Sequence, residues 1–305
     1  MKELYLPSTD QKNKLHVVIW EPEAEPKAIL QISHGMVEYI ERFAGFAGWL
    51  NRQGILVIGN DHLGHGKTAS CDEDLGYIGA EKSKTIVDDL HSVSVNAKMK
   101  YGKIPYFLFG HSMGSFMARR YLMTYGDELD GAILSGTGYT PTSVLNVAGF
   151  VAGWLKMIHG ERYRSPFLKK LSFTGYLDHI ENPRTPNDWL THDEAIVDKY
   201  NADKFCTYTF TINGYQTLFG TLRYIQKPKN LEKIPKDVPI LLISGKEDPV
   251  GSYGEGVKKV YESYQAAGIK DVSMHLYEGK RHELTNEIGK EEVFEDVKEW
   301  MFKHI

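Results

Sequence analysis

The sequence has few cysteines and no long apolar run. Its two cysteines, Cys71 and Cys206, cannot build a disulfide framework, and neither has a second cysteine at metal-ligand spacing. We expect both to be packing residues in a reducing compartment, and the protein to be cytoplasmic. The N-terminal residues lack the apolar stretch that a secretory signal requires, and no run of about 18 apolar residues is present to span a membrane.

The sequence has no large excess of positive or negative charge. The 305 residues include 36 Lys and Arg against 40 Asp and Glu, a formal net charge of -4, and no basic block is long enough to indicate a nucleic-acid groove. Nucleic acids are therefore not expected as partners. A chain of this length can bury a sizeable core in one large domain, so stability does not require oligomerisation and the oligomeric state stays open.

Short apolar runs alternate with segments of helical periodicity. Nearly continuous apolar runs predict strands at residues 15–20, 28–33, 55–59, 106–110, 131–136, 239–245 and 272–277. Helical spacing predicts helices at residues 40–53, 83–99, 113–125, 252–267 and 290–304. Because strands that alternate with helices require crossover connections, we expect an α/β fold with a mostly parallel central sheet flanked by helices.

The alternation stops in one long segment, residues 137–236. We therefore expect residues 1–136 and 237–305 to form the core and residues 137–236 to form a helical cap insertion. Within this insertion, residues 144–158 are apolar on nearly all sides and residues 205–219 are rich in aromatic side chains. Such residues could form the small core of a helical subdomain, or the inner face of a lid that meets an apolar substrate.

The stretch Gly110-His111-Ser112-Met113-Gly114 lies at the junction between a predicted strand and a predicted helix. It matches G-x-S-x-G, in which a serine occupies a strained turn and projects its hydroxyl from the sheet edge. Side chains at the two glycine positions would collide with neighbouring backbone. A serine at a helix N-terminus also directs the helix dipole toward a developing anion. We expect Ser112 to be a nucleophile; the alternative is a serine that only caps the helix.

A serine hydroxyl needs a base to remove its proton, so this hypothesis requires a carboxylate and then a histidine later in the chain. Asp248 follows the predicted strand at residues 239–245, where the ligand-facing loops of parallel sheets lie. Glu247 is the competing carboxylate. His282 lies in the loop before the last predicted helix, and we expect it to be the general base with Asp248 as its partner.

The tetrahedral anion that such a nucleophile forms needs two N–H donors. One is expected from Met113, the residue after the nucleophile, and the other from the turn after an early strand. The stretch His34-Gly35-Met36 supplies that turn: Gly35 allows close approach of the backbone, and the Met36 N–H is the expected second donor. A plain strand-ending turn is the alternative.

Five segments resemble one known branch of enzymes. They read SHGMVEYIERF, NDHLGHGKT, FGHSMGSFMARRYL, SGKEDPVG and EGKRHELTNE. They are similar to the monoacylglycerol lipase and lysophospholipase branch of the α/β-hydrolase fold, and the resemblance is weakest in the first half of the cap. It implies that Ser112, Asp248 and His282 form a catalytic triad. It also implies that Met36 and Met113 are the oxyanion donors and that the inserted segment is a cap over an acyl-chain tunnel.

Two positions depart from that branch. Tyr39 stands where the branch carries the second histidine of H-G-x-x-E-H, and Lys67-Thr68 follows GHG where a pair ending in serine is common. Neither position belongs to the expected triad, so both bear on the substrate rather than on hydrolysis.

A metal site is not expected. His62 and His65 have the spacing of metal ligands, but no carboxylate or cysteine completes a set. We expect instead that Asp61 and His62 hold their loop by hydrogen bonds, and we expect no cofactor.

These features indicate a serine hydrolase that cleaves carboxylic esters through an acyl-enzyme, with monoacylglycerols, lysophospholipids or similar single-chain esters as substrates. The cap could also make peripheral membrane contact. An amidase similar to proline iminopeptidase is one alternative, in which acidic cap residues would bind a substrate amine; the candidates are Glu181, Asp188, Asp193 and Glu194. A non-catalytic ligand-binding homologue is another.

Overall fold

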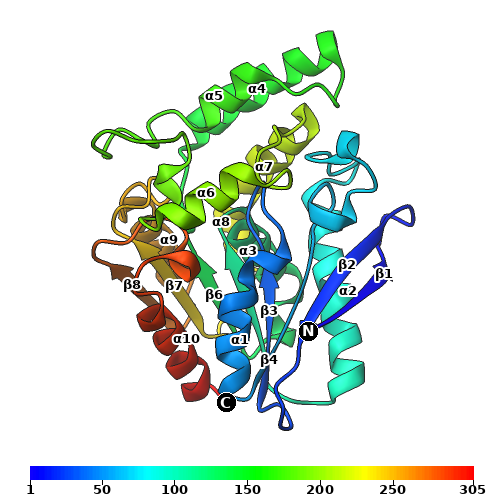
Figure 1. The fold of residues 1–305 in the computed structure, drawn as a ribbon, viewed down its shortest axis with the longest axis vertical. Helices are drawn as coiled ribbons and strands as arrows, with labels where there is room; N and C mark the ends of the chain where they lie inside the picture. The colour runs from blue at the N-terminus through cyan, green and yellow to red at the C-terminus, as the bar shows by residue number, and fades with distance from the viewer.

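One eight-stranded sheet runs through the molecule (Figure 1). The computed structural model describes residues 1–305. The strands are β1 (Lys2–Pro7), β2 (Lys14–Trp20), β3 (Ala28–Ser33), β4 (Ile55–Asn60), β5 (Tyr106–His111), β6 (Gly131–Ser135), β7 (Ile240–Gly245) and β8 (Val272–Tyr277). Their order is β1-β2-β4-β3-β5-β6-β7-β8, antiparallel at β1-β2 and β2-β4 and parallel elsewhere. The predicted, mostly parallel sheet is confirmed.

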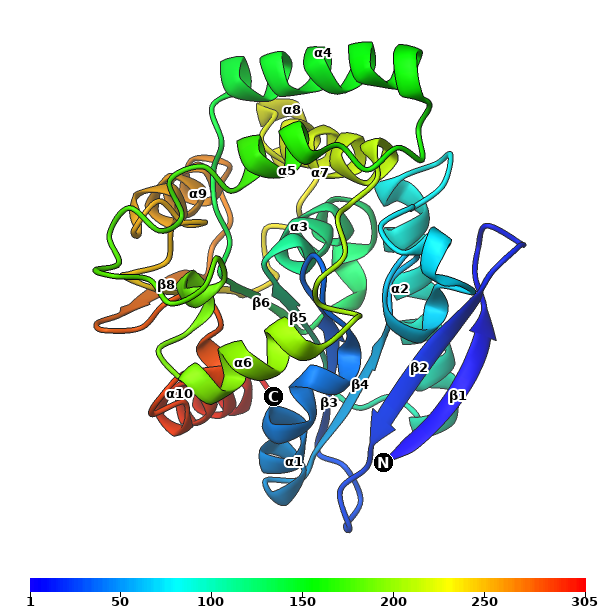
Figure 2. The same ribbon diagram turned by 45° about the horizontal axis from the view of Figure 1, so that its top comes forward.

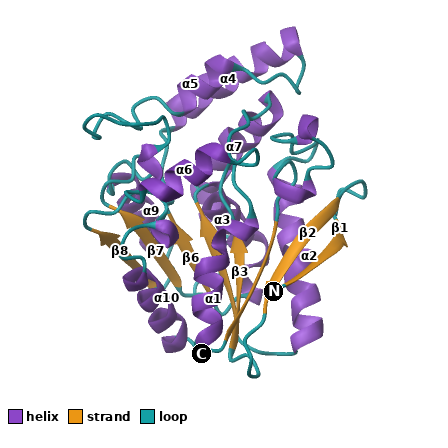
Figure 3. Cartoon of the chain, in the orientation of Figure 1, coloured by secondary structure: helices purple, strands orange, loops and turns teal.

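Helices cover both faces of this sheet (Figure 3). The flanking helices are α1 (Ala44–Arg52) and α10 (Glu291–Lys303) on one face, and α2 (Ser83–Tyr101), α3 (Met113–Tyr125) and α9 (Glu255–Ala266) on the other. Alternate residues of an inner strand enter different cores. In β5, Tyr106 and Leu108 pack with α2 and α3, whereas Phe107 and Phe109 pack with α1 and α10. This two-sided burial is why the inner strands read as continuous apolar runs.

The two edge strands carry the weakest apolar pattern in the sheet. β1 was not predicted, because its residues alternate between exposed and half-buried positions and begin with Lys2 and Glu3. β8 was predicted but is only partly buried, as the outermost strand on the opposite edge. Both edges lie away from β5, the inner strand that ends at the G-x-S-x-G motif.

The segment predicted to be a cap runs between β6 and β7. Its helices are α4 (Thr142–His159), α5 (Pro166–Ser172), α6 (Glu194–Ala202), α7 (Ile212–Ile225) and α8 (Pro228–Leu231). α4 lies outermost, across the top of the molecule (Figure 2), and α7 packs against both α4 and α3. None of the helices combines the length and the apolar character that crossing a membrane requires. The division of the chain into core and cap stays a prediction.

The two cysteines differ in their surroundings. Cys71 is exposed and precedes a short 3₁₀ turn of acidic residues (Asp72–Asp74), so the expectation that it packs in a core is wrong. Cys206 is buried beside Trp189 and Tyr200, as predicted. The prediction for Cys71 was wrong because it relied on the general tendency of cysteine to be buried. The polar residues around Cys71 place it instead in a surface turn.

Candidate active site

Ser112 occupies the turn between β5 and α3. Its backbone adopts φ 53° and ψ -122°, a left-handed conformation that is strained for a residue with a side chain. A Cβ atom at Gly114 would collide with the carbonyl oxygen of Ser33, and one at Gly110 would lie 2.5 Å from the carbonyl oxygen of Gly114. The steric argument for both glycines is therefore confirmed. The turn is kept tight by backbone packing on both sides.

His282 and Asp248 meet next to this turn. His282 Nδ1 lies 2.9 Å from Asp248 Oδ2, and both side chains are buried. Asp248 also accepts hydrogen bonds from the Ser244 hydroxyl at 3.0 Å and from the Val250 N–H at 2.8 Å. The competing carboxylate, Glu247, is half exposed and lies 3.1 Å from His192 rather than beside His282.

The Asp248–His282 pair sets the protonation of both groups. Burial raises the pKa of Asp248, but the charge and hydrogen bond of His282 outweigh it, so the pKa lies below its ordinary value. Burial lowers the pKa of His282, but the Asp248 charge and hydrogen bond raise it above 6.5. Asp248 is therefore an anion at neutral pH, and it favours the imidazolium form of its partner.

His111 and Gly136 shape the space around the imidazole. The ring centroids of His111 and His282 are 4.7 Å apart, and burial, with the neighbouring His282 charge, lowers the pKa of His111 to about 3. His111 is thus neutral near the reacting groups. A Cβ at Gly136, which has a φ of 58°, would lie 2.8 Å from His282 Cε1, so this glycine leaves the imidazole its room. Neither contact was anticipated from the sequence.

Ser112 and His282 line one cavity. No hydrogen bond joins the Ser112 hydroxyl to His282, and the bond between a nucleophile and its base is often long or poorly aligned until a substrate binds. The structure thus brings the predicted serine, histidine and aspartate to one place, and their catalytic roles stay predictions.

The turn His34-Gly35-Met36 passes directly beside the serine. A Cβ at Gly35 would lie 3.1 Å from Ser112 Cβ and 2.6 Å from Glu38 Oε1. The Met36 N–H donates to no acceptor within the chain, the N–H of Met113 has no partner inside its helix because Met113 is the first residue of α3, and both residues line the cavity. Both N–H groups therefore lie beside the cavity that Ser112 lines, and their role as oxyanion donors stays a prediction.

The histidines near the Ser112 turn form hydrogen bonds that hold the surrounding loops. His34 Nδ1 donates to the Gly35 carbonyl at 2.8 Å, and its Nε2 accepts from the His62 N–H at 2.9 Å. His62 Nε2 lies 3.0 Å from the Ser33 hydroxyl, and Asp61 accepts from the Lys67 N–H at 2.8 Å. The expectation that Asp61 and His62 hold their loop is confirmed. No group of three or more potential metal ligands is present in the structure.

A buried ion cluster next to the site was missed. Arg42 donates to Glu38 at 2.8 Å and, through both terminal nitrogens, to Glu283 at 2.7 Å. Burial raises the pKa of both carboxyls. At Glu283 the charge of Arg42 outweighs burial, so the pKa falls below its ordinary value. At Glu38 burial outweighs the charge of Arg42, so the pKa stays above its ordinary value. Glu38 also accepts from the Gly35 N–H, so Arg42 links the turn beside Ser112 to the loop of His282.

The cavity has a volume of about 780 Å³, and 16 of its 32 lining residues are hydrophobic. Side chains of the β6–β7 segment that line it include Phe173, Tyr176, Leu177, Trp189, Tyr208 and Phe210. The Trp189 ring lies 5.0 Å from that of His282, centroid to centroid. Within the aromatic stretch at 205–219, Tyr208 lines the cavity, whereas Phe219 packs in the large core that also contains residues of α2 and α3. Whether this stretch faces a substrate stays a prediction.

The two departures from the resembled branch have structural partners. The Tyr39 hydroxyl donates to Asp203 at 2.7 Å, and Lys67 pairs with Glu3 at 3.0 Å and with Glu41 at 3.2 Å. Tyr39 thus ties the turn after β3 to the loop that follows α6. Neither side chain forms a hydrogen bond or ion pair with Ser112, His282 or Asp248.

Known proteins share this architecture over most of the chain. A family model described as "Serine aminopeptidase, S33" matches residues 24–289. Monoglyceride lipase of Rattus norvegicus is 26% identical over 290 residues, covering 94% of this chain and 86% of the rat protein. Monoacylglycerol lipase of Mycolicibacterium smegmatis is 24% identical over 291 residues, covering 94% and 92%. A solved carboxyl esterase from Bacillus coagulans has a TM-score of 0.92 at 32% identity, covering 99% of this chain and 98% of that structure.

Proposed function

The chain belongs to the family described as serine aminopeptidase S33, and from its cavity and its lipase relatives we propose that it cleaves single-chain esters, such as monoacylglycerols and lysophospholipids, through an acyl-enzyme on Ser112. The protein is a carboxylic ester hydrolase with the α/β-hydrolase fold. The proposal concerns its substrate and the roles of its site residues.

In this mechanism, Ser112 attacks the ester carbonyl while His282 takes the hydroxyl proton. Asp248 holds the imidazole in the required tautomer and stabilises the imidazolium. The N–H groups of Met36 and Met113 bind the tetrahedral anion. His282 then protonates the leaving alcohol, and a water molecule that it deprotonates releases the fatty acid and restores Ser112.

The cavity is the observation that carries the choice of substrate. Its volume of about 780 Å³ is in the range that accommodates a small ligand, and the aromatic walls beside Ser112 suit an acyl chain. A single chain could lie along these walls with its ester at Ser112, whereas a second chain would add to the volume required. The names of the relatives, monoglyceride and monoacylglycerol lipase, support the same substrate class.

A chain-length series tests this proposal. We expect kcat/KM for monoacylglycerols to rise by roughly four-fold for each methylene that is buried, about 0.8 kcal/mol, until the cavity is filled. Lysophosphatidylcholines of the same chain lengths measure the preference for the head group, and diacylglycerols serve as the two-chain control. Rates that do not depend on chain length would contradict an acyl-binding cavity.

An amidase that recognises a substrate amine has less support. None of the acidic residues proposed to bind the amine, Glu181, Asp188, Asp193 and Glu194, lines the cavity. The acidic residues that do line it, Glu38 and Glu283, are both paired with Arg42. The site therefore offers an approaching amine no free carboxylate, and an ester substrate fits better.

The proposal extends to peripheral contact with a lipid surface through α4. Large apolar side chains are exposed along its outer side, namely Val144, Val147, Phe150, Trp154, Met157 and Ile158. The opposite side of the helix is buried at Leu145, Ala148 and Ala152. Since monoacyl lipids partition into membranes and micelles, an apolar helix on the outside of the cap would bring the enzyme to its substrate.

A further inference from the structure

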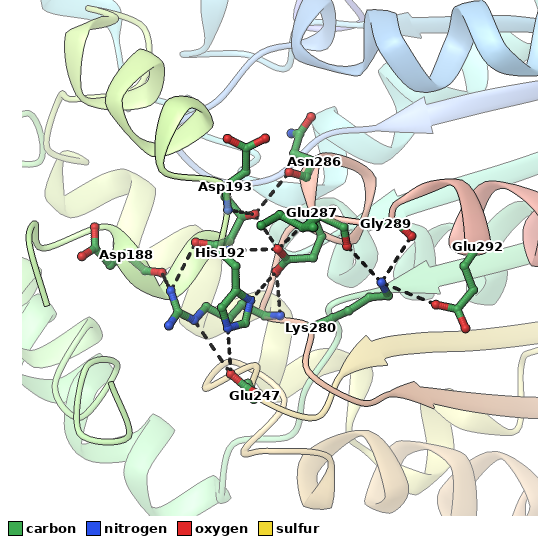
Figure 4. Close-up of polar contacts among 12 residues, drawn as sticks. Asp188, His192, Asp193, Glu247, Lys280, Asn286, Glu287, Gly289 and Glu292 are labelled. Carbon is green, nitrogen blue, oxygen red and sulfur yellow. Dashed lines mark hydrogen bonds and ion pairs between the residues drawn. The ribbon is translucent and has the colours of Figure 1, made fainter. Parts of the chain in front are cut away.

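Glu287 is a buried carboxylate in the loop that follows His282, and no catalytic role above uses it. It is 1% exposed and lies after the short 3₁₀ helix Leu284–Asn286. Figure 4 shows it at the centre of a polar network that includes His192 and Glu247. A buried carboxyl group requires hydrogen-bond partners, so the partners of Glu287 are informative.

Its hydrogen bonds reach two separate segments. From the β6–β7 segment, the Thr191 hydroxyl donates at 3.0 Å, and the His192 N–H and Nδ1 donate at 2.9 and 3.1 Å. From its own loop, the N–H groups of Arg281 and Ile288 donate at 3.0 and 2.9 Å. Five donors thus converge on the two oxygens of Glu287, and three of the five come from the cap side.

Further hydrogen bonds join the same two segments on either side of His282. The Arg281 guanidinium donates to the carbonyl of Asp188 at 2.8 Å and to that of Thr191 at 3.3 Å. The Glu283 N–H donates to the Leu190 carbonyl at 2.7 Å. The neighbours of His282 in sequence are therefore both bonded to the residues that flank Trp189.

We propose that Glu287 is a positioning residue that connects residues 188–192 of the cap to the loop of His282. We call its hydrogen bonds to these two segments the Glu287 joint. This joint fixes the position of the general base, His282, and of Trp189, which lines the cavity beside Ser112. The proposal rests on the role of His282 given under "Proposed function". Glu287 touches no reacting atom. It acts through the backbone of Arg281 and through the segment that carries Trp189.

The chemistry of the joint requires a carboxylate. All five groups that face Glu287 are donors, and an ionised carboxylate only accepts. Glutamine has the same shape, but its amide nitrogen would face N–H groups, so at least one buried donor would lose its partner. The joint should then loosen while the rest of the fold remains.

The test compares Glu287→Gln with Glu292→Gln in the full-length enzyme, using p-nitrophenyl acetate. Glu292 is a matched control, because it is a mostly exposed carboxylate that pairs only with Lys280 on the same loop. We expect Glu287→Gln to lower kcat by about 10- to 100-fold with little change in KM, since a displaced general base costs rate. Glu292→Gln should stay within about two-fold of wild type. Circular dichroism checks that both variants are folded.

A double-mutant cycle with His192→Ala separates positioning from a general loss of stability. His192 is partly exposed, so this variant can be tested even if Glu287→Gln does not fold. His192→Ala alone should lower kcat, and combining it with Glu287→Gln should cost less than the product of the two single effects. An unchanged kcat in a folded Glu287→Gln variant, or in His192→Ala, would overturn the proposal. It would also be overturned if the effects of the two substitutions on kcat were independent, so that the double variant lost the product of the two single effects. Activity that survives Ser112→Ala would instead overturn the proposed function.

Discussion

Two neighbouring carboxylates, Glu247 and Asp248, have different environments in the fold. Asp248 is buried against His282, whereas Glu247 is half exposed. The Ser244 hydroxyl and the Val250 N–H bind Asp248 and hold it in the interior. The sequence predicts a carboxylate at this position, because it follows a strand, but which of the two side chains turns inward depends on these local hydrogen bonds.

Asp248→Asn tests the role of this carboxylate. The amide should lower kcat by about 10²- to 10⁴-fold, because it no longer stabilises the imidazolium or fixes its tautomer. The pH dependence has a definite sign. Activity requires neutral His282, so kcat/KM should fall as the pH drops through a pKa above 6.5.

In Asp248→Asn the largest interaction that raises the pKa of His282 is gone, while burial and the smaller effects of Glu283 and Glu38 remain, so the midpoint of the residual activity should move to lower pH. Glu247→Gln is the control for this measurement. A larger loss of kcat in Glu247→Gln than in Asp248→Asn would show that Glu247, and not Asp248, is the partner of His282.

At the scale of secondary-structure elements, the turn after β3 and the loop before α10 are joined by Arg42. Glu38 and Arg42 lie four residues apart and could have been paired from the sequence, but Glu283 lies 241 residues further along the chain. Pairs at this separation depend on how the elements are arranged in space. The G-x-S-x-G turn, in contrast, could be predicted because its residues are contiguous between a strand and a helix, although Gly114 is also required by its contact with Ser33 at the end of β3.

The outer side of α4 carries exposed apolar side chains. Replacing Phe150 and Trp154 by serine should weaken binding to phospholipid vesicles and lower the rate on monoacylglycerol held in those vesicles, because both side chains are exposed. Vesicle sedimentation measures the binding. Hydrolysis of dissolved p-nitrophenyl acetate is the control and should be unchanged.

Equal vesicle binding by the Phe150 and Trp154 variant and by wild type would remove α4 as the docking surface. Replacement of Leu145 by serine makes no suitable comparison, because that side chain is buried and its loss would disturb the packing of the helices between β6 and β7. The exposed side of α4 can therefore be tested without disturbing the side that packs against α7.

At the scale of the whole molecule, the order of apolar runs was enough to predict the fold. Inner strands buried on both faces give a strong signal, so all seven predicted strands are present, and only the edge strand β1 was missed. The arrangement of the helices between β6 and β7 was not predictable in the same way. Their contacts, such as that of Trp189 with His282, join distant parts of the chain and are not marked by local periodicity.

In the proposed mechanism, Ser112 forms the acyl-enzyme. The most direct measurement is labelling of the full-length enzyme with a fluorophosphonate, located by mass spectrometry, beside the rate of p-nitrophenyl ester hydrolysis by Ser112→Ala. We expect one label per chain, on Ser112, and a folded Ser112→Ala variant that takes no label and retains almost no activity. A label on another residue, or an undiminished rate in Ser112→Ala, would contradict the account.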